Sequence, residues 1–107
     1  MGDEDPTGPG SRPSQATEEL TVQHEHGLHL RPAANFVRLA AKFRSDVRLV
    51  NLTRGGGRQA SARSLLEVTA LGVNQGHTIR LTASGEDADE AVRALADLIR
   101  SNFAAPA

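Results

Sequence analysis

The sequence of 107 residues contains no cysteine, and this absence excludes disulfide bonds and thiolate chemistry. It has no apolar run near the roughly 20 residues that a membrane-spanning helix needs. The N-terminus is acidic and rich in proline and glycine, whereas a signal peptide is basic and then apolar. The formal net charge is only −1, so composition gives no reason to expect a nucleic-acid partner. We therefore expect a cytoplasmic protein with no membrane insertion.

The first 17 residues differ in composition from the rest of the chain. They combine prolines and glycines with an acidic run and few apolar side chains, too few to offset the entropy lost on ordering. We predict a disordered tail over residues 1–17, one folded domain over residues 18–103 and a short C-terminal tail over residues 104–107.

Alternation of apolar and polar residues indicates four short strands within this domain. They lie at residues 20–22, 47–52, 58–62 and 79–83. Apolar residues at helical spacing indicate a first helix over about 32–43 and a third over about 88–99, with a short middle helix over about 65–71. The order β-α-β-β-α-β-α predicts an α+β domain with its helices on one face of a mostly antiparallel sheet.

Residues 27–34, with the sequence Gly-Leu-His-Leu-Arg-Pro-Ala-Ala, contain the main candidate site. Pro32 suits a first helical turn because its missing amide would be unpaired there. Neither Leu30 nor Arg31 has a side-chain oxygen to cap the remaining amides, so this helix start suits an anion. We interpret His29 as a phosphoryl carrier. The backbone amides of Leu30 and Arg31 and the Arg31 guanidinium would stabilise the phosphoryl group.

This run resembles the active-site motif of HPr, the histidine-containing phosphocarrier of the bacterial phosphoenolpyruvate:sugar phosphotransferase system. Residues 60–66, 72–79 and 85–87 resemble the family's regulatory-serine segment and its entries into the last strand and the last helix. The resemblance implies an open-faced sandwich of four antiparallel strands with three helices on one side. It also implies phosphorylation on Nδ1 of His29, enzyme I as the donor and IIA-type proteins as acceptors. We further expect a monomer without a cofactor.

Three more residues are candidates for partner docking. The resemblance places Leu65 and Leu66 in an apolar contact for upstream and downstream partners. Because two adjacent leucines on a short helix cannot both face a core, at least one should be exposed. Arg38 shares a polar helix face with Arg31 and Lys42, which is either a docking surface for acidic partners or simply a solvated face.

Ser64 has two competing interpretations. Residues 64–67, Ser-Leu-Leu-Glu, form a capping box, in which the hydroxyl accepts a first-turn amide and Glu67 reaches back. The resemblance instead makes Ser64 a regulatory phosphoserine served by a serine kinase and a phosphorylase. Kinase-regulated members of the family usually have glycine in place of Glu67, so we favour the cap. Asp87 followed by Glu90 predicts a second capping box on the third helix.

His24, His26 and His29 have a His-x-His-x-x-His spacing, but no fourth ligand completes a zinc site, and we expect no bound metal.

Three functions are compatible with the sequence as a whole. The chain is a phosphocarrier for sugar uptake, a regulatory protein that binds partners according to its phosphorylation state, or an interaction module without phosphoryl chemistry. His29 and Arg31 argue against the module, whereas the other two share every motif. We favour the phosphocarrier.

Overall fold

The computed structural model describes residues 14–103. Along this part of the chain the elements are β1 (Gln15–Thr21), α1 (Leu30–Ala40), β2 (Asp46–Asn51), β3 (Gln59–Ser61), α2 (Leu65–Ala70), β4 (Thr78–Ser84) and α3 (Ala88–Arg100). Residues 1–13 of the predicted N-terminal tail, and the predicted tail over residues 104–107, lie outside the described part. Within residues 14–103, no helix is long and apolar enough to cross a membrane.

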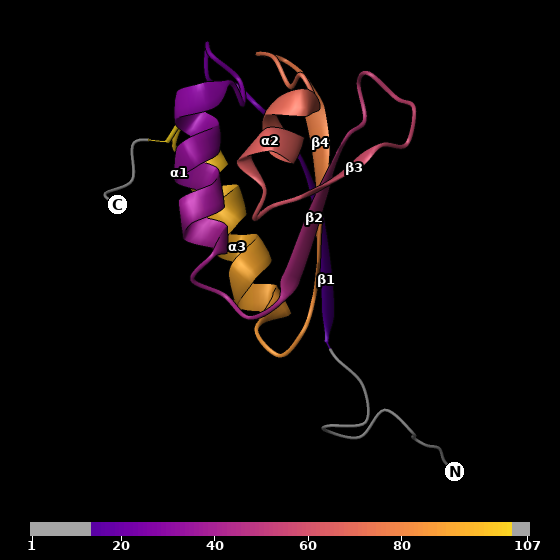
Figure 1. Ribbon diagram of the computed structural model, residues 1–107, viewed down its shortest axis with the longest axis vertical. Helices are drawn as coiled ribbons and strands as arrows, with labels where there is room; N and C mark the ends of the chain where they lie inside the picture. The colour runs from indigo at the N-terminus through magenta and orange to yellow at the C-terminus, as the bar shows by residue number, and fades with distance from the viewer. Residues whose placement is uncertain (1–13, 104–107) are drawn as a thin grey trace.

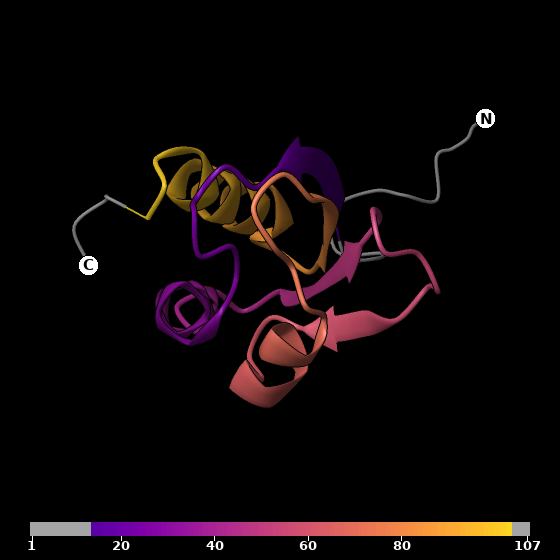
Figure 2. The ribbon, with the colours of Figure 1, turned by 90° about the horizontal axis from the view of Figure 1, so that it is seen from above.

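The strands form one antiparallel sheet in the order β1-β4-β2-β3. All three helices lie on the same side of this sheet, as the two perpendicular views show (Figures 1 and 2). The predicted element order and the predicted open-faced sandwich are therefore confirmed.

The hydrophobic core fills the space between the helices and the sheet. Phe36 of α1, Leu81 of β4 and Leu95 of α3 have no solvent exposure. Successive side chains of a strand point to opposite faces, so each strand sends only alternate residues into this core. The opposite face of the sheet is polar, and there Arg80 of β4 pairs with Glu19 of β1 at 3.0 Å. One apolar and one solvated face explain why the helices cover a single side.

The strand β1 begins earlier than the composition predicted. Residues 15–17 pair with residues 82–84 of β4, and the Gly85 amide donates to the Ser14 carbonyl at 2.9 Å. The predicted boundary of the tail after residue 17 is therefore wrong. Polar side chains made this segment resemble the tail, but its ordering comes from backbone hydrogen bonds, which composition does not report.

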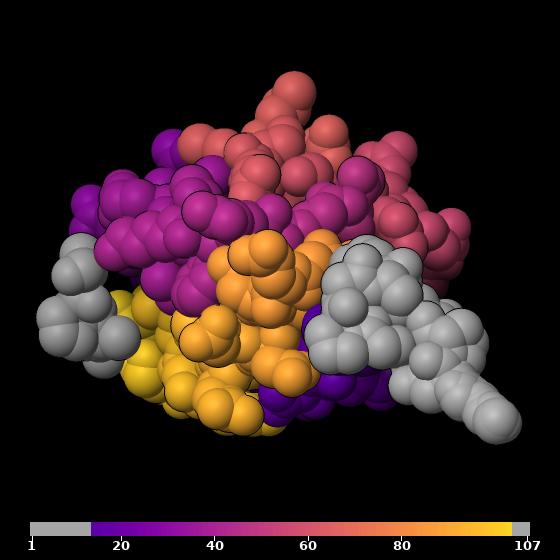
Figure 3. Space-filling model, turned by 90° about the horizontal axis from the view of Figure 1, so that it is seen from below, coloured from indigo at the N-terminus to yellow at the C-terminus, as the bar shows by residue number. Residues whose placement is uncertain are grey.

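Asp87 joins two segments at the end of the molecule opposite to the start of α1. Its carboxylate accepts from the Ser45 hydroxyl at 2.5 Å and from the amides of Arg44 and Ser45 at 2.9 Å each. The Ser45 hydroxyl, followed by the Arg44 amide, lowers the pKa of Asp87 below its ordinary value. In Figure 3 the turn before α3, in orange, lies against the magenta segment after α1.

Asp87 precedes α3 as predicted, but its side chain makes no hydrogen bond to that helix. The capping box predicted with Glu90 is therefore wrong, because the carboxylate is already occupied by Arg44 and Ser45. The spacing predicted correctly that Asp87 precedes α3, but in the folded chain its carboxylate binds the amides of Arg44 and Ser45.

A chain that begins at Glu18 should be less stable than one that begins at Ser14. The shorter chain loses the pairing of residues 15–17 with β4 and the acceptor of the Gly85 amide. We expect its Tm to fall by about 4–8 °C for each 1 kcal/mol lost, measured by circular dichroism on the two truncated chains. Equal melting temperatures would show that these pairings contribute nothing to stability.

Candidate functional site

His29 lies at the start of α1 as its N-cap residue, with extended backbone at φ −75° and ψ −175°. The sequence predicted that Pro32 opens this helix, but α1 begins earlier, at Leu30. Pro32 still falls in the first turn, so its missing amide removes no helical hydrogen bond. The Ala33 amide donates to the His29 carbonyl at 2.9 Å and closes this turn. The candidate histidine is thus part of the helix end itself.

The first two amides of α1, those of Leu30 and Arg31, have no acceptor in the described part of the chain. The next residue, Pro32, has no amide hydrogen to offer. The His29 side chain does not cap the helix either, so the predicted absence of a side-chain cap is confirmed. These two N–H groups lie at the helix end that carries partial positive charge. They are the kind of donors that bind an oxyanion.

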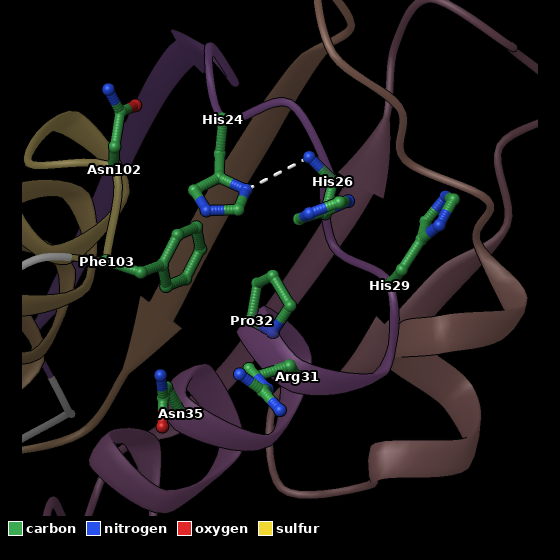
Figure 4. A pocket seen from close by; sticks show the side chains of 8 residues that line it. All are labelled: His24, His26, His29, Arg31, Pro32, Asn35, Asn102 and Phe103. Atoms are coloured by element: carbon green, nitrogen blue, oxygen red, sulfur yellow. Dashed lines mark hydrogen bonds between the residues drawn. The ribbon is translucent and has the colours of Figure 1, made fainter.

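The His29 ring is exposed and contacts a second loop. Its Nε2 lies 2.7 Å from Oδ1 of Asn74, in the turn before β4. Within residues 14–103, Nδ1 has no hydrogen-bond partner. In Figure 4 the ring points away from Arg31. The predicted phosphorylation atom is therefore the ring nitrogen that the described residues leave unbonded.

A close approach of two loops brings Asn74 to His29. The Leu28 amide donates to the Val73 carbonyl at 2.9 Å. Gly27 has a φ of +54°, and a Cβ on it would lie only 2.2 Å from the Val73 oxygen. No larger residue fits there unless the loops separate. No local sequence pattern connects Asn74 to His29, because the two residues lie 45 positions apart in the chain.

Arg31 lies on a different side of the helix start from the His29 ring. Figure 4 shows its guanidinium directed towards Asn35, so the structure does not bring the two predicted functional side chains into contact. Arg38, further along α1, donates to Oδ1 of Asn35 at 2.9 Å, and its side chain is exposed. Lys42, just after the helix, is also exposed, so this polar surface carries three cationic side chains.

A hollow of about 450 Å³ lies beside the start of α1 (Figure 4). It is lined by His24, His26, His29, Arg31, Pro32, Asn35, Asn102 and Phe103. The Phe103 ring meets the His24 ring edge-on, with centroids 5.5 Å apart. Asn102 and Phe103 both have positive φ, +58° and +63°, and this turn after α3 brings Phe103 back to the loop before α1. No pattern in the sequence predicts this contact.

The three histidines of the loop do not converge on a common point. Nδ1 of His24 accepts the His26 amide at 3.0 Å, whereas His29 faces Asn74. In the part of the chain that the structure describes, no three histidine, aspartate or glutamate side chains are placed to share a metal ion.

Ser64 caps α2, as the sequence predicted, because its hydroxyl accepts the Glu67 amide at 3.2 Å. The Glu67 carboxylate, however, accepts the Ser61 amide at 2.8 Å and does not reach the Ser64 amide. The Ser64 amide donates instead to the Ser61 carbonyl at 3.0 Å. The second half of the predicted capping box is therefore wrong, because the backbone of Ser61, the last residue of β3, supplies both partners.

Three leucines are the large apolar side chains that stay exposed within residues 14–103. Leu30 is 66% exposed, Leu66 79% and Leu65 36%. The sequence required at least one exposed leucine at the start of α2, and both are exposed. Their helices, α1 and α2, pack against each other. Exposed apolar side chains on neighbouring helices are typical of a surface that contacts another protein.

The fold and the site together define an open-faced β-sandwich with an exposed histidine at an uncapped helix start. Residues 16–101 match the family model described as the PTS HPr component phosphorylation site. This chain belongs to the HPr family of the phosphotransferase system.

Known relatives cover the domain at moderate identity. The chain is 45% identical over 85 residues to a multiphosphoryl transfer protein of Salmonella typhimurium, covering 79% of this chain but only 22% of that protein. It thus spans about a fifth of the multiphosphoryl transfer proteins it matches. It is 44% identical over 80 residues to the phosphocarrier protein HPr of Haloferax volcanii, covering 75% of this chain and 88% of that one.

A solved structure has the same fold. The crystal structure of HPr-C-His from Thermoanaerobacter tengcongensis superposes with a TM-score of 0.77 at 36% sequence identity. The superposition covers 86% of this chain and 99% of that one.

Replacing Ser64 with alanine should lower the free energy of unfolding by about 1 kcal/mol, because the Glu67 amide loses its acceptor. Ser64→Asp should keep the stability of the wild type, since aspartate also caps. It should slow phosphoryl acceptance, because the added carboxylate would repel the negatively charged phosphoryl donor. Urea unfolding and labelling rates on both variants measure the two effects. Wild-type stability of Ser64→Ala would contradict the cap, and wild-type labelling of Ser64→Asp would contradict a regulatory role.

Proposed function

We propose that this chain accepts a phosphoryl group from enzyme I on Nδ1 of His29 and passes it to IIA-type proteins of a sugar phosphotransferase system. The observation that carries the proposal is an exposed His29 at the uncapped start of α1, in a chain of the HPr family. The names of the relatives, phosphocarrier protein and multiphosphoryl transfer protein, support phosphoryl transfer as the shared activity.

The chemistry of the site suits a carrier. A neutral imidazole nitrogen is available near pH 7 to attack phosphorus, and the resulting P–N bond is labile enough for the group to move on. The amides of Leu30 and Arg31 would bind the phosphoryl oxygens, and the long Arg31 side chain, on the same helical turn, would pair with them. Two amides and one guanidinium would stabilise the bound phosphoryl group only moderately, so it could still be transferred to an acceptor.

The surface around His29 supplies contacts for two different partners. Leu30, Leu65 and Leu66 offer apolar area, and Arg38 offers positive charge to an acidic partner. Because donor and acceptor must each reach the same nitrogen, we propose that both dock on this surface in turn. We propose that the chain does so as a monomer in the cytoplasm.

The regulatory alternative uses the same residues and differs only in where the phosphoryl group goes. The chain labelled with radioactive phosphate should be mixed with purified IIA-type proteins from the same organism. Loss of label from the chain to one of these proteins supports the carrier. Retention of label in the presence of all of them supports a signalling protein.

His29→Ala should abolish phosphorylation. Incubation of the wild type with phosphoenolpyruvate and a matching enzyme I should add one acid-labile phosphate per chain, measured by mass spectrometry. His24→Ala and His26→Ala are the matched controls, since each removes an imidazole from the same loop, and both should be labelled fully. If His29→Ala is labelled like the wild type, the proposed function is wrong.

Arg31→Ala should slow phosphoryl transfer by about 10- to 1000-fold, as expected when one charged stabiliser of a transferring group is lost. The fold should remain intact because the side chain is exposed. Arg38→Ala removes the same charge from the same helix and should weaken docking, with a higher KM and a nearly unchanged kcat. Equal kinetics of Arg31→Ala and the wild type would exclude a role for this guanidinium.

A further inference from the structure

We infer that Asn74 is a positioning residue that holds the proton of His29 on Nε2 and leaves the lone pair of Nδ1 for phosphorus. The inference deepens the proposed function and rests on it. Oδ1 of Asn74 lies 2.7 Å from Nε2, a short distance for this type of bond. An amide oxygen only accepts, so the nitrogen opposite it must donate. In a neutral imidazole the other nitrogen is then without a proton.

Asn74 is well placed for this task because its own backbone is fixed. Its amide donates to Nδ1 of His77 at 3.1 Å, and its carbonyl accepts the His77 amide at 3.0 Å. Behind the His77 ring, Nδ2 of Asn51 lies 3.1 Å from the same Nδ1, and Asn51 is only 3% exposed. The buried Asn51 side chain thus holds the His77 ring in place, and this ring holds the backbone of the turn at Asn74. The Asn74 carboxamide extends from a rigid base to His29.

The backbone of the His29 loop is fixed against the same turn. Leu28 bonds to Val73, the residue before Asn74, and Gly27 allows the contact. Both members of the His29–Asn74 pair therefore lie next to a backbone hydrogen bond that joins their loops. This geometry sets the direction of the ring as well as the position of its proton.

The proton on Nε2 matters for both directions of transfer. On acceptance, the Nδ1 lone pair forms the P–N bond, the donor leaves with the electron pair of its own bond to phosphorus, and the ring becomes cationic. On donation, the P–Nδ1 bond breaks and its electron pair returns to the ring. With Nε2 protonated the ring leaves as neutral imidazole; without that proton it would leave as an imidazolate anion, a much poorer leaving group.

Asn74 should therefore act more strongly on the phosphorylated ring than on the free one. A hydrogen bond from a cationic donor is about twice as strong as one between neutral groups. The contact with Oδ1 of Asn74 thus stabilises the cationic ring more than the neutral ring, and the cationic ring is the form that acceptance of the phosphoryl group produces. A polar surface contact without this role would leave the proton position and the transfer rate unchanged when it is removed.

The proton position is measured by nitrogen-15 NMR on the unphosphorylated chain at about pH 8. The wild type should show His29 protonated on Nε2, with slow exchange of that proton. In Asn74→Leu, similar in volume but without an acceptor, exchange should become faster and the Nδ1–H tautomer more populated. Asn74→Asp keeps an acceptor oxygen and should restore the wild-type spectrum.

Gln75→Leu is the matched control for this spectrum. It makes the same kind of change one position along the turn, where Nε2 of the Gln75 side chain donates to the Gln23 carbonyl and not to His29. The His29 spectrum should be that of the wild type. Protonation of wild-type His29 on Nδ1 would overturn the inference, because Nδ2 of the Asn74 side chain would then donate to Nε2 of His29. An unchanged spectrum in Asn74→Leu would overturn it as well.

The effect on transfer is measured with the same variants. Asn74→Leu should slow acceptance of the phosphoryl group, the step in which the ring becomes cationic, by about 10- to 100-fold, the equivalent of one hydrogen bond to a charged group. Its KM for enzyme I should change much less, and Gln75→Leu should transfer at the wild-type rate. A wild-type rate for Asn74→Leu would overturn the inference. Failure of the proposed function would show separately, as undiminished labelling of His29→Ala.

Discussion

The approach of the loop before α1 to the turn before β4 is the contact on which the candidate site depends. At this point the Leu28 amide bonds to the Val73 carbonyl, and only a residue without a Cβ fits at Gly27. The contact fixes the backbone directly before His29 and directly before Asn74. A loop that was free to move here would leave the His29 ring without a defined direction, and its nitrogens without defined roles.

The helix α1 is held by hydrogen bonds at both ends, in addition to its packing in the core. At its start the loop with His29 is bonded to the turn before β4, and after its end the Arg44 and Ser45 amides bond to Asp87. The lowered pKa of Asp87 reflects how well these donors stabilise the ionised carboxylate. Because both ends are fixed, the amides of Leu30 and Arg31 point outwards from a rigid frame.

The three helix starts illustrate how structure and function compete for the same amides. Ser64 caps α2 with its own hydroxyl, as expected for a helix whose start has only to be stable. Asp87 stands before α3 but serves as a link between segments. The start of α1 has no side-chain cap, which leaves its donors for an external anion at a typical cost of about 1 kcal/mol. A serine or aspartate at an N-cap position would accept these amides with its own side chain and leave no donors for an anion.

The sequence by itself determined the order of the elements, the buried stripes of α1 and α3, the Ser64 cap of α2 and the position of His29 at a helix start. Each of these follows from residues within one or two turns of one another, where periodicity and spacing are direct signals. Only the tertiary structure decided that β1 begins at Gln15, that the Glu67 and Asp87 carboxylates bond elsewhere, and that Asn74 meets His29. These outcomes depend on which segments the sheet order brings together. A hydrogen bond across 45 residues leaves no periodic trace in the chain.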